Sequence, residues 1–197
     1  MSAATASEAE AVLDFWFGAP DSADFGSARK AWFSKDAAFD AAIRERFGAL
    51  VERALRGELE AWGDESRSSL VQILLLDQFT RNAFRGTARS FAGDARALAA
   101  ASRMVGSRQD EALLPFMRGF VYMPFEHAEG LAMQDEAIRL FTKLVNEAPE
   151  QADMLDYAHR HRDVIERFGR FPHRNEILGR QSTAEEIAFV KQPGSAF

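Results

Sequence analysis

Cysteine is absent from the 197-residue chain. Disulfide bonds, thiolate metal sites, iron–sulfur clusters and cysteine nucleophiles are therefore excluded, and a reducing compartment fits the composition. The first ten residues have neither a basic start nor an apolar run, so we expect no signal peptide. No apolar stretch approaches the ~20 residues that cross a bilayer. We therefore expect a cytoplasmic protein with no membrane contact.

Positive charge is also scarce. The chain has 24 Lys and Arg against 30 Asp and Glu, a net charge of -6. We therefore expect no nucleic-acid partner, because binding to nucleic acid needs a basic face. Residues 159–180 are an exception, with six arginines against three acidic side chains. This basic island should either meet an anion or neutralise carboxylates buried in the protein itself.

Patterns typical of β-strands are lacking. Apolar residues instead recur every three or four positions, and alanine is abundant, which favours helices. Short loops between long helices make neighbours antiparallel, so we expect an all-α fold of stacked antiparallel helical hairpins. The length fits one domain over residues 1–197, and we expect residues 1–6 to be flexible.

Start and stop signals divide the chain into helices. Ser7 and Glu10 form a capping box that predicts the start of the first helix. Ser182 and Glu185 repeat the pattern before the last helix, and Pro124 suits the first turn of another. The expected helices cover about 7–17, 36–55, 68–81, 90–105, 109–120, 124–146, 149–168 and 182–192.

Asp77 does not fit an ordinary core helix. It lies four residues after Ile73 and three after Leu74, on the apolar face of the helix expected at 68–81. Burying a carboxylate costs free energy unless the group is paired. We expect an ion pair with Arg81 or with an arginine of the basic island. The alternative is a general base or ligand acceptor with a perturbed pKa.

Two histidines show the same feature. His127 and Gln134 lie on the apolar stripe of the helix expected at 124–146, with Glu126 at its edge, and His161 lies on the apolar face of the next. A lone histidine on such a face is usually a core residue, but two beside a carboxylate favour a polar cluster. The helical Glu-x-x-His motif of metal sites and the glycine-rich phosphate motifs are absent, so we expect neither metal nor cofactor.

Two segments end their helices with Phe, Arg and Asn close together. Residues 76–86 and 168–175 have this composition. Their polar side chains can cap free helix carbonyls. Alternatively, both turns face one cleft, where Arg81, Arg85, Arg170 and Arg174 clamp a carboxylate or phosphate. The candidate ligand-binding residues are Asp77, Gln78, Arg81, Asn82, Arg85, Glu126, His127, Glu129, Gln134, His161, Arg170, His173, Arg174 and Asn175.

The combination of motifs resembles one bacterial family. The segments are 12–18 (VLDFWFG), 76–86 (LDQFTRNAFRG), 122–129 (YMPFEHAE) and 168–175 (FGRFPHRN). They are similar to the family called domain of unknown function nine-two-four. Thr80 replaces an expected proline and Ala128 an expected serine. The resemblance implies an all-α fold similar to tetratricopeptide-repeat superhelices. It implies no activity, because the family has none assigned.

Three functions remain open at this point. The first is a binding module with an Arg- and His-lined cleft for a small anionic ligand or an acidic peptide. The second is an enzyme that uses Asp77, Glu126 or His127 in acid–base chemistry on a small polar substrate. The third is a purely structural polar cluster. The phenylalanine-rich helix faces also leave room for a homodimer.

Overall fold

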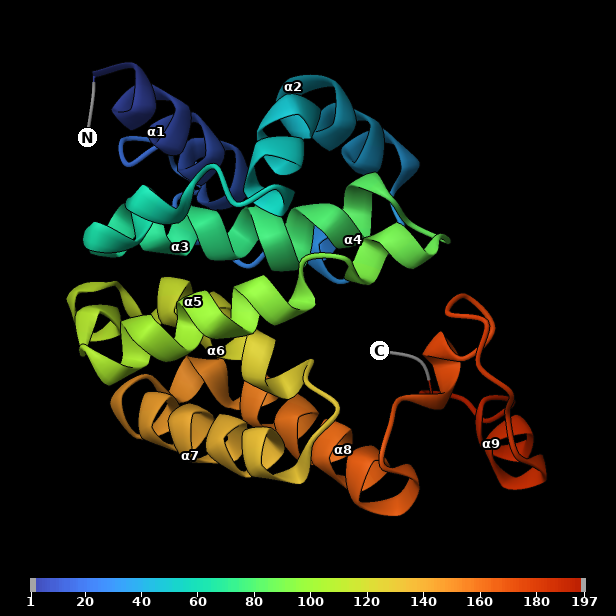
Figure 1. The fold of residues 1–197 in the computed structure, drawn as a ribbon. Helices are drawn as coiled ribbons and strands as arrows, with labels where there is room; N and C mark the ends of the chain where they lie inside the picture. Colours follow the sequence, from blue (N-terminus) through green and yellow to red (C-terminus); the bar gives the residue numbers. More distant parts are fainter. Residues whose placement is uncertain (1–2, 196–197) are drawn as a thin grey trace.

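The computed structural model describes residues 3–195, and the side chains of residues 6–195. The described chain holds helices and turns and no strand, which confirms the predicted all-α fold (Figure 1). The likeness to tetratricopeptide-repeat superhelices stays a prediction. The α-helices are α1 Ala3–Phe17, α2 Ala37–Leu55, α3 Ser66–Leu74, α4 Thr80–Ala83, α5 Asp94–Gly106, α6 Pro115–Glu126, α7 Leu131–Glu147, α8 Ala152–Phe168 and α9 Ala184–Phe189. Short 3-10 turns lie at Lys30–Trp32, Glu60–Asp64, Ala88–Phe91, Gln109–Ala112, Pro149–Gln151 and Pro172–Arg174.

The helices are arranged around a long central one. A π-helical turn, Leu75–Phe79, joins α3 and α4 end to end. In Figure 1, α1 and α2 lie on one side of this central helix, and α5 and α6 lie on the other. Helices α7 and α8 pack on each other beyond α6. The central helix is buried nearly all round, as its apolar sequence predicts.

An aromatic cluster fills the space between α1, α2, α6 and the central helix. Trp16 lies at its centre and stacks on Trp32 with ring centroids 5.9 Å apart. Phe79 from the π-helical turn lies 5.2 Å from the same ring, and Phe120 from α6 lies 5.7 Å from it. Trp32 also donates a hydrogen bond from Nε1 to the carbonyl of Trp16, at 3.1 Å. These contacts fix one side of the central helix.

The prediction of one helix over 124–146 is wrong. Helix α6 begins at Pro115, which suits the first turn because its missing N–H is not needed there. Pro124 lies in the last turn of α6, and His127 caps its C-terminal end. Gly130, in an extended conformation, precedes the start of α7 at Leu131. His127 and Gln134 therefore belong to different elements.

Three predicted starts are also wrong. Helix α1 begins at Ala3, before the expected capping box, because the alanine-rich segment is itself a strong helix former. Residues 3–6 are thus helical and residues 1–2 lie outside the described part, while the expected flexibility of residues 1–6 stays a prediction. Helix α5 begins at Asp94 rather than near residue 90. The last helix uses Thr183 and Glu186 as its capping box, one residue later than predicted. Within residues 3–195, no helix has the length and hydrophobicity to cross a membrane.

Candidate functional site

The π-helical turn carries Asp77 into the centre of a polar cluster. A π-helical turn inserts an extra residue into a helix and is frequent at functional sites. Asp77 is fully buried. Its Oδ1 accepts a hydrogen bond from Nδ1 of His127 at 2.7 Å, and its Oδ2 accepts one from Nε2 of Gln78 at 2.6 Å. Arg81 completes the pairing, with Nη1 3.1 Å from Oδ1. The predicted pair of Asp77 with Arg81 is therefore confirmed.

These partners decide the charge of Asp77. Burial alone would raise its pKa, but the charge of Arg81, the neighbouring His127 and the hydrogen bonds from His127 and Gln78 outweigh that cost. The pKa of Asp77 therefore lies well below its usual range, and the side chain is a carboxylate at neutral pH. A carboxylate can only accept hydrogen bonds, so Nδ1 of His127 is the donor in the pair.

Asp94 links this carboxylate to the basic island. It pairs with Arg81 through both oxygens, at 2.9 and 3.2 Å, and its Oδ2 is 3.2 Å from Nη1 of Arg174. Asp94 is the first residue of α5, and Gly93 precedes it. A Cβ atom at position 93 would overlap the carbonyl oxygen of Leu76 in the π-helical turn. The glycine therefore permits the close approach that brings Asp94 to Arg81.

A second histidine–carboxylate pair lies beside the first. Nδ1 of His161 is 2.8 Å from Oε1 of Glu126 and 2.9 Å from the carbonyl oxygen of Tyr157. Because both neighbours accept hydrogen bonds, Nδ1 of His161 carries the proton. The rings of His161 and His127 are 6.0 Å apart. The structure thus brings together two histidines that the sequence places in separate helices.

Arg174 is the cation with the least complete pairing in the cluster. Its side chain is only 7% exposed, and its one ion pair among the described residues is to Asp94, which Arg81 shares. No described residue bonds its buried Nε. The guanidinium lies between the rings of Phe91 and Phe171, 4.7 and 4.4 Å from their centroids. Burial, followed by repulsion from Arg81, lowers the pKa of Arg174 to about 10.

His173 follows the same electrostatic pattern. Burial lowers its pKa to about 3, and the charge of Arg174 and the neighbouring His161 act in the same direction. The imidazole is therefore neutral at pH 7. Burial is the main cause of the low pKa of both His173 and Arg174, and neighbouring cations add to it.

Other predicted residues hold the cluster in place. Glu129 accepts a hydrogen bond from the backbone N–H of Phe171 at 2.8 Å and pairs with Arg180 at 2.6 Å. Asn175 accepts from Nε of Arg180 at 2.9 Å. Gln134 donates two hydrogen bonds of 2.7 Å to carbonyls at and just beyond the end of α6. These contacts fix the turn around Arg174 and the end of the helix that carries His127.

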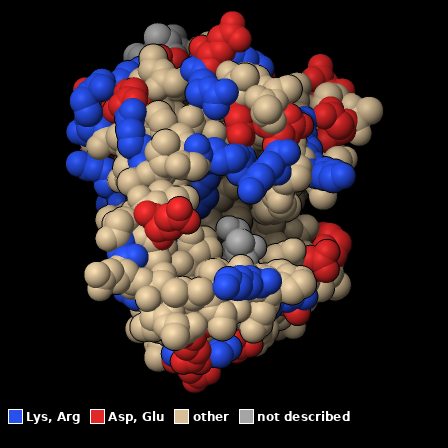
Figure 2. All heavy atoms as spheres, turned by 90° about the vertical axis from the view of Figure 1, so that its right-hand side faces the viewer, with Lys and Arg blue, Asp and Glu red and all other residues tan. Residues whose placement is uncertain are grey.

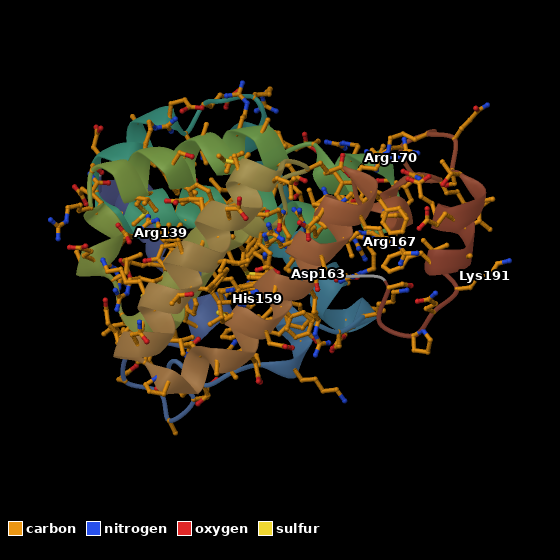
Figure 3. The ribbon with its side chains drawn as sticks, turned by 90° about the horizontal axis from the view of Figure 1, so that it is seen from below. Arg139, His159, Asp163, Arg167, Arg170 and Lys191 are labelled. Atoms are coloured by element: carbon orange, nitrogen blue, oxygen red, sulfur yellow. The ribbon has the colours of Figure 1, made fainter. Side chains whose placement is uncertain are left out.

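Two of the four predicted clamp arginines have their own carboxylates. Arg85 holds Asp40 at 2.6 and 2.9 Å and is oriented by Asn82 at 2.8 Å. Arg170 holds Glu186 at 2.6 and 2.9 Å. Figure 3 shows Arg170 at the end of α8, on the side of the C-terminal segment. Arg81 and Arg174 are therefore the two clamp arginines that the cluster contains.

The surface near α4, the end of α8 and the C-terminal segment is hollowed, with Lys and Arg side chains along one edge (Figure 2). A separate cavity of about 210 Å³ lies between the Glu60–Asp64 turn, α3 and α5, and is lined by Glu60, Gln72 and Arg103 among others. Among the described residues, no group of three or more His, Asp or Glu side chains is suited to a metal ion.

Comparison with known proteins gives the family and no activity. The structure of ATU0120, a protein of unknown function from Agrobacterium tumefaciens, is similar with a TM-score of 0.83. The two sequences are 42% identical, over 95% of this chain and 98% of that one. No curated protein matches the chain. The family model described as "Bacterial protein of unknown function (DUF924)" matches residues 12–194. The chain therefore belongs to the DUF924 family, as its motifs imply.

Proposed function

We propose that this protein binds a small anionic ligand, a carboxylate or a phosphate, at Arg174. The observation that carries the proposal is the incomplete pairing of this buried guanidinium. It shares its one carboxylate with Arg81, and its Nε has no partner among the described residues. A buried charge is costly unless paired and hydrogen-bonded. An anion at this position would complete the pairing.

The neighbouring groups suit such a ligand. A guanidinium offers two parallel N–H donors that match a carboxylate or phosphate. Phe91 and Phe171 cover its faces, and His173 is neutral and adds no repelling charge. The small exposed fraction of Arg174 favours a small molecule over an acidic peptide, because a chain needs a wider opening. The proposal therefore narrows the ligand to a compact anion.

A purely structural role is the second candidate. It is supported by the two-point pairing of Arg81 with Asp94 and by the contacts of Asp77. In this reading, the cluster fixes how the central helix meets α5, α6 and the basic island. It predicts that substitutions in the cluster lower the stability of the protein and that no ligand raises it. The experiment below separates the two candidates.

The test is ligand-induced stabilisation measured by thermal unfolding. The purified protein is titrated with acetate, succinate, citrate and inorganic phosphate at constant ionic strength. A ligand present at 100 times its Kd adds about 2.7 kcal/mol to the free energy of unfolding. We expect at least one of these anions to raise Tm, and we expect Arg174→Gln to lose that rise.

The matched control is Arg139→Gln. Arg139 lies on α7 and pairs with Glu136 at the surface, away from the cluster (Figure 3). This variant should keep the full response to the anion. Equal responses in Arg174→Gln and the wild type would contradict the proposal. A wild type that no anion stabilises, together with an Arg174→Gln variant of much lower Tm, would favour the structural role.

A further inference from the structure

We propose that His127 is a general base that removes a proton from the carbon beside the keto group of a small oxo acid bound at Arg174. This inference rests on the proposed function, since it uses the anion site to hold the substrate. It adds a reaction, proton transfer to and from carbon, and a substrate class.

The geometry of His127 carries the proposal. Its Nδ1 donates to Asp77, which is fixed by Gln78 and Arg81. The neutral ring therefore has its lone pair on Nε2, the nitrogen that a general base uses. No described residue bonds that nitrogen, and the side chain is 11% exposed. Orientation by a buried carboxylate, with the second nitrogen left available, is the arrangement of the histidine in catalytic triads.

The two histidine–carboxylate pairs differ in exposure and in contacts, and the differences favour His127 over His161 as the base. The side chain of His161 is only 5% exposed, and its Nδ1 contacts a backbone carbonyl as well as Glu126. His127 is more exposed and has no such backbone contact, and it ends α6 rather than lying inside a helix. His161 is therefore placed as a neighbour that packs against the base, and its ring lies 5.5 Å from that of Phe171.

The electrostatics keep the base in its working form. Burial lowers the pKa of His127, the charge of Arg81 lowers it further, and Asp77 opposes both. The ring is therefore neutral at pH 7 and able to accept a proton. Once protonated, it is stabilised by the carboxylate of Asp77. The same side chain can thus take up a proton and release it within one turnover.

The step balances without a co-reactant. The C–H bond beside the keto group breaks, its proton passes to Nε2 of His127, and its electron pair forms the C=C bond of an enolate. The keto C=O bond becomes a C–O bond, and the negative charge moves to that oxygen. Arg174 stabilises this charge. Return of the proton from Nε2 to the same carbon regenerates the oxo acid, and its transfer to the enolate oxygen gives the enol.

An oxo acid is the substrate class that these groups fit. Its carboxylate matches the guanidinium of Arg174, and its keto group makes the neighbouring C–H acidic enough for an imidazole base. The described cluster supplies no cysteine or metal site, so the inference uses only groups present: one base, one orienting carboxylate and two cations.

The experiment is hydrogen–deuterium exchange into pyruvate, α-ketobutyrate and acetoacetate, followed by proton NMR in D2O. We expect the wild type to speed exchange at the carbon beside the keto group of at least one acid. General-base catalysis contributes about 100-fold or more, so His127→Gln should lower the rate by about that factor. His127→Gln should still be stabilised by the same acid in thermal unfolding.

The controls separate the two proposals. His159→Gln changes an exposed histidine of α8, outside the cluster, and should exchange at the wild-type rate (Figure 3). An acid that stabilises the wild type but is not exchanged faster than in buffer would overturn the general base and leave anion binding in place. Full exchange by His127→Gln would also overturn it. If none of the three acids stabilises or exchanges, both the base and an oxo acid site are contradicted, and the acetate and phosphate titrations judge anion binding by itself.

Discussion

The two sides of the π-helical turn Leu75–Phe79 are stabilised in different ways. On one side, Phe79 lies against several rings, with centroids 6.1 Å from Phe15, 5.2 Å from Trp16 and 5.4 Å from Phe47. On the other side, Asp77 has one hydrogen bond or ion pair to each of its side-chain partners. The aromatic side thus has many interchangeable contacts, and the polar side has few specific ones.

This difference determines what each side tolerates. Dispersion and burial are not directional, so an apolar side chain of similar volume can replace another at small cost. A buried ion pair is different, because removal of one charge leaves the other without compensation. A cluster of this second kind adds little stability for its complexity, which is a physical reason to look for function there.

We expect the largest loss of stability from Asp77→Asn, on the polar side of the turn. The substitution keeps the shape but removes the charge that compensates Arg81 and orients His127. Breaking a buried pair in this way costs about 3–5 kcal/mol. Urea unfolding with an unchanged m-value would measure the loss as a fall in the midpoint.

Leu75→Met is the matched substitution in the same turn. Leu75 is also fully buried, and the exchange of Leu for Met nearly conserves volume. We expect it to cost less than about 1.5 kcal/mol. Similar losses for the two variants would show that the polar side is no more specific than the apolar one, and the comparison would break down.

The sequence could predict the local half of this site. Helical periodicity shows that Asp77 shares a face with Ile73 and Leu74, which predicts its burial, and Arg81 lies one turn away. The expected start of α2 near residue 36 is likewise confirmed. Asp36 caps this helix and accepts hydrogen bonds of 3.0 Å from two backbone amides. Signals of this kind depend on residues within one or two turns, and the sequence displays them directly.

The non-local half could not be read in the same way. His127 meets Asp77 from 50 residues away, and the misplaced helix at Pro124 put His127 inside a helix instead of at its end. Asp94 was absent from the predicted site. Only the close packing of Gly93 on Leu76 brings its carboxylate to Arg81. Such contacts depend on how elements pack, which periodicity does not encode.

Gly93→Ala should give the next largest loss of stability. The added Cβ would overlap the carbonyl oxygen of Leu76, so α5 must move away from the π-helical turn and carry Asp94 with it. Overpacking of this kind typically costs 1–3 kcal/mol. A Cβ atom at Gly106, the last residue of α5, would meet nothing within 4 Å, so Gly106→Ala should be neutral or gain up to about 1 kcal/mol of stability. Thermal unfolding of the pair checks this, and equal Tm values would show that the close approach at Gly93 is not required.

The smallest expected effect is a dependence of stability on pH. The apolar contacts of the aromatic side do not change with pH. His173 lies near Arg174, His161, His127 and Glu129. Burial, helped by Arg174 and His161, lowers its pKa from the usual 6.5 to about 3. Between these values the unfolded chain binds a proton that the folded protein excludes, so the free energy of unfolding must fall as the pH falls.

The slope that His173 contributes is at most about 1.4 kcal/mol per pH unit below pH 6.5, and its contribution vanishes above that pH. Urea midpoints measured from pH 7.5 down to pH 5 would show it. His173→Gln should flatten the curve in that range, whereas His159→Gln, which changes an exposed histidine, should leave it unchanged. If His173→Gln keeps the wild-type slope, His173 titrates in the folded protein as it does in the unfolded chain. Burial and the charge of Arg174 would then not disfavour the protonated form of His173.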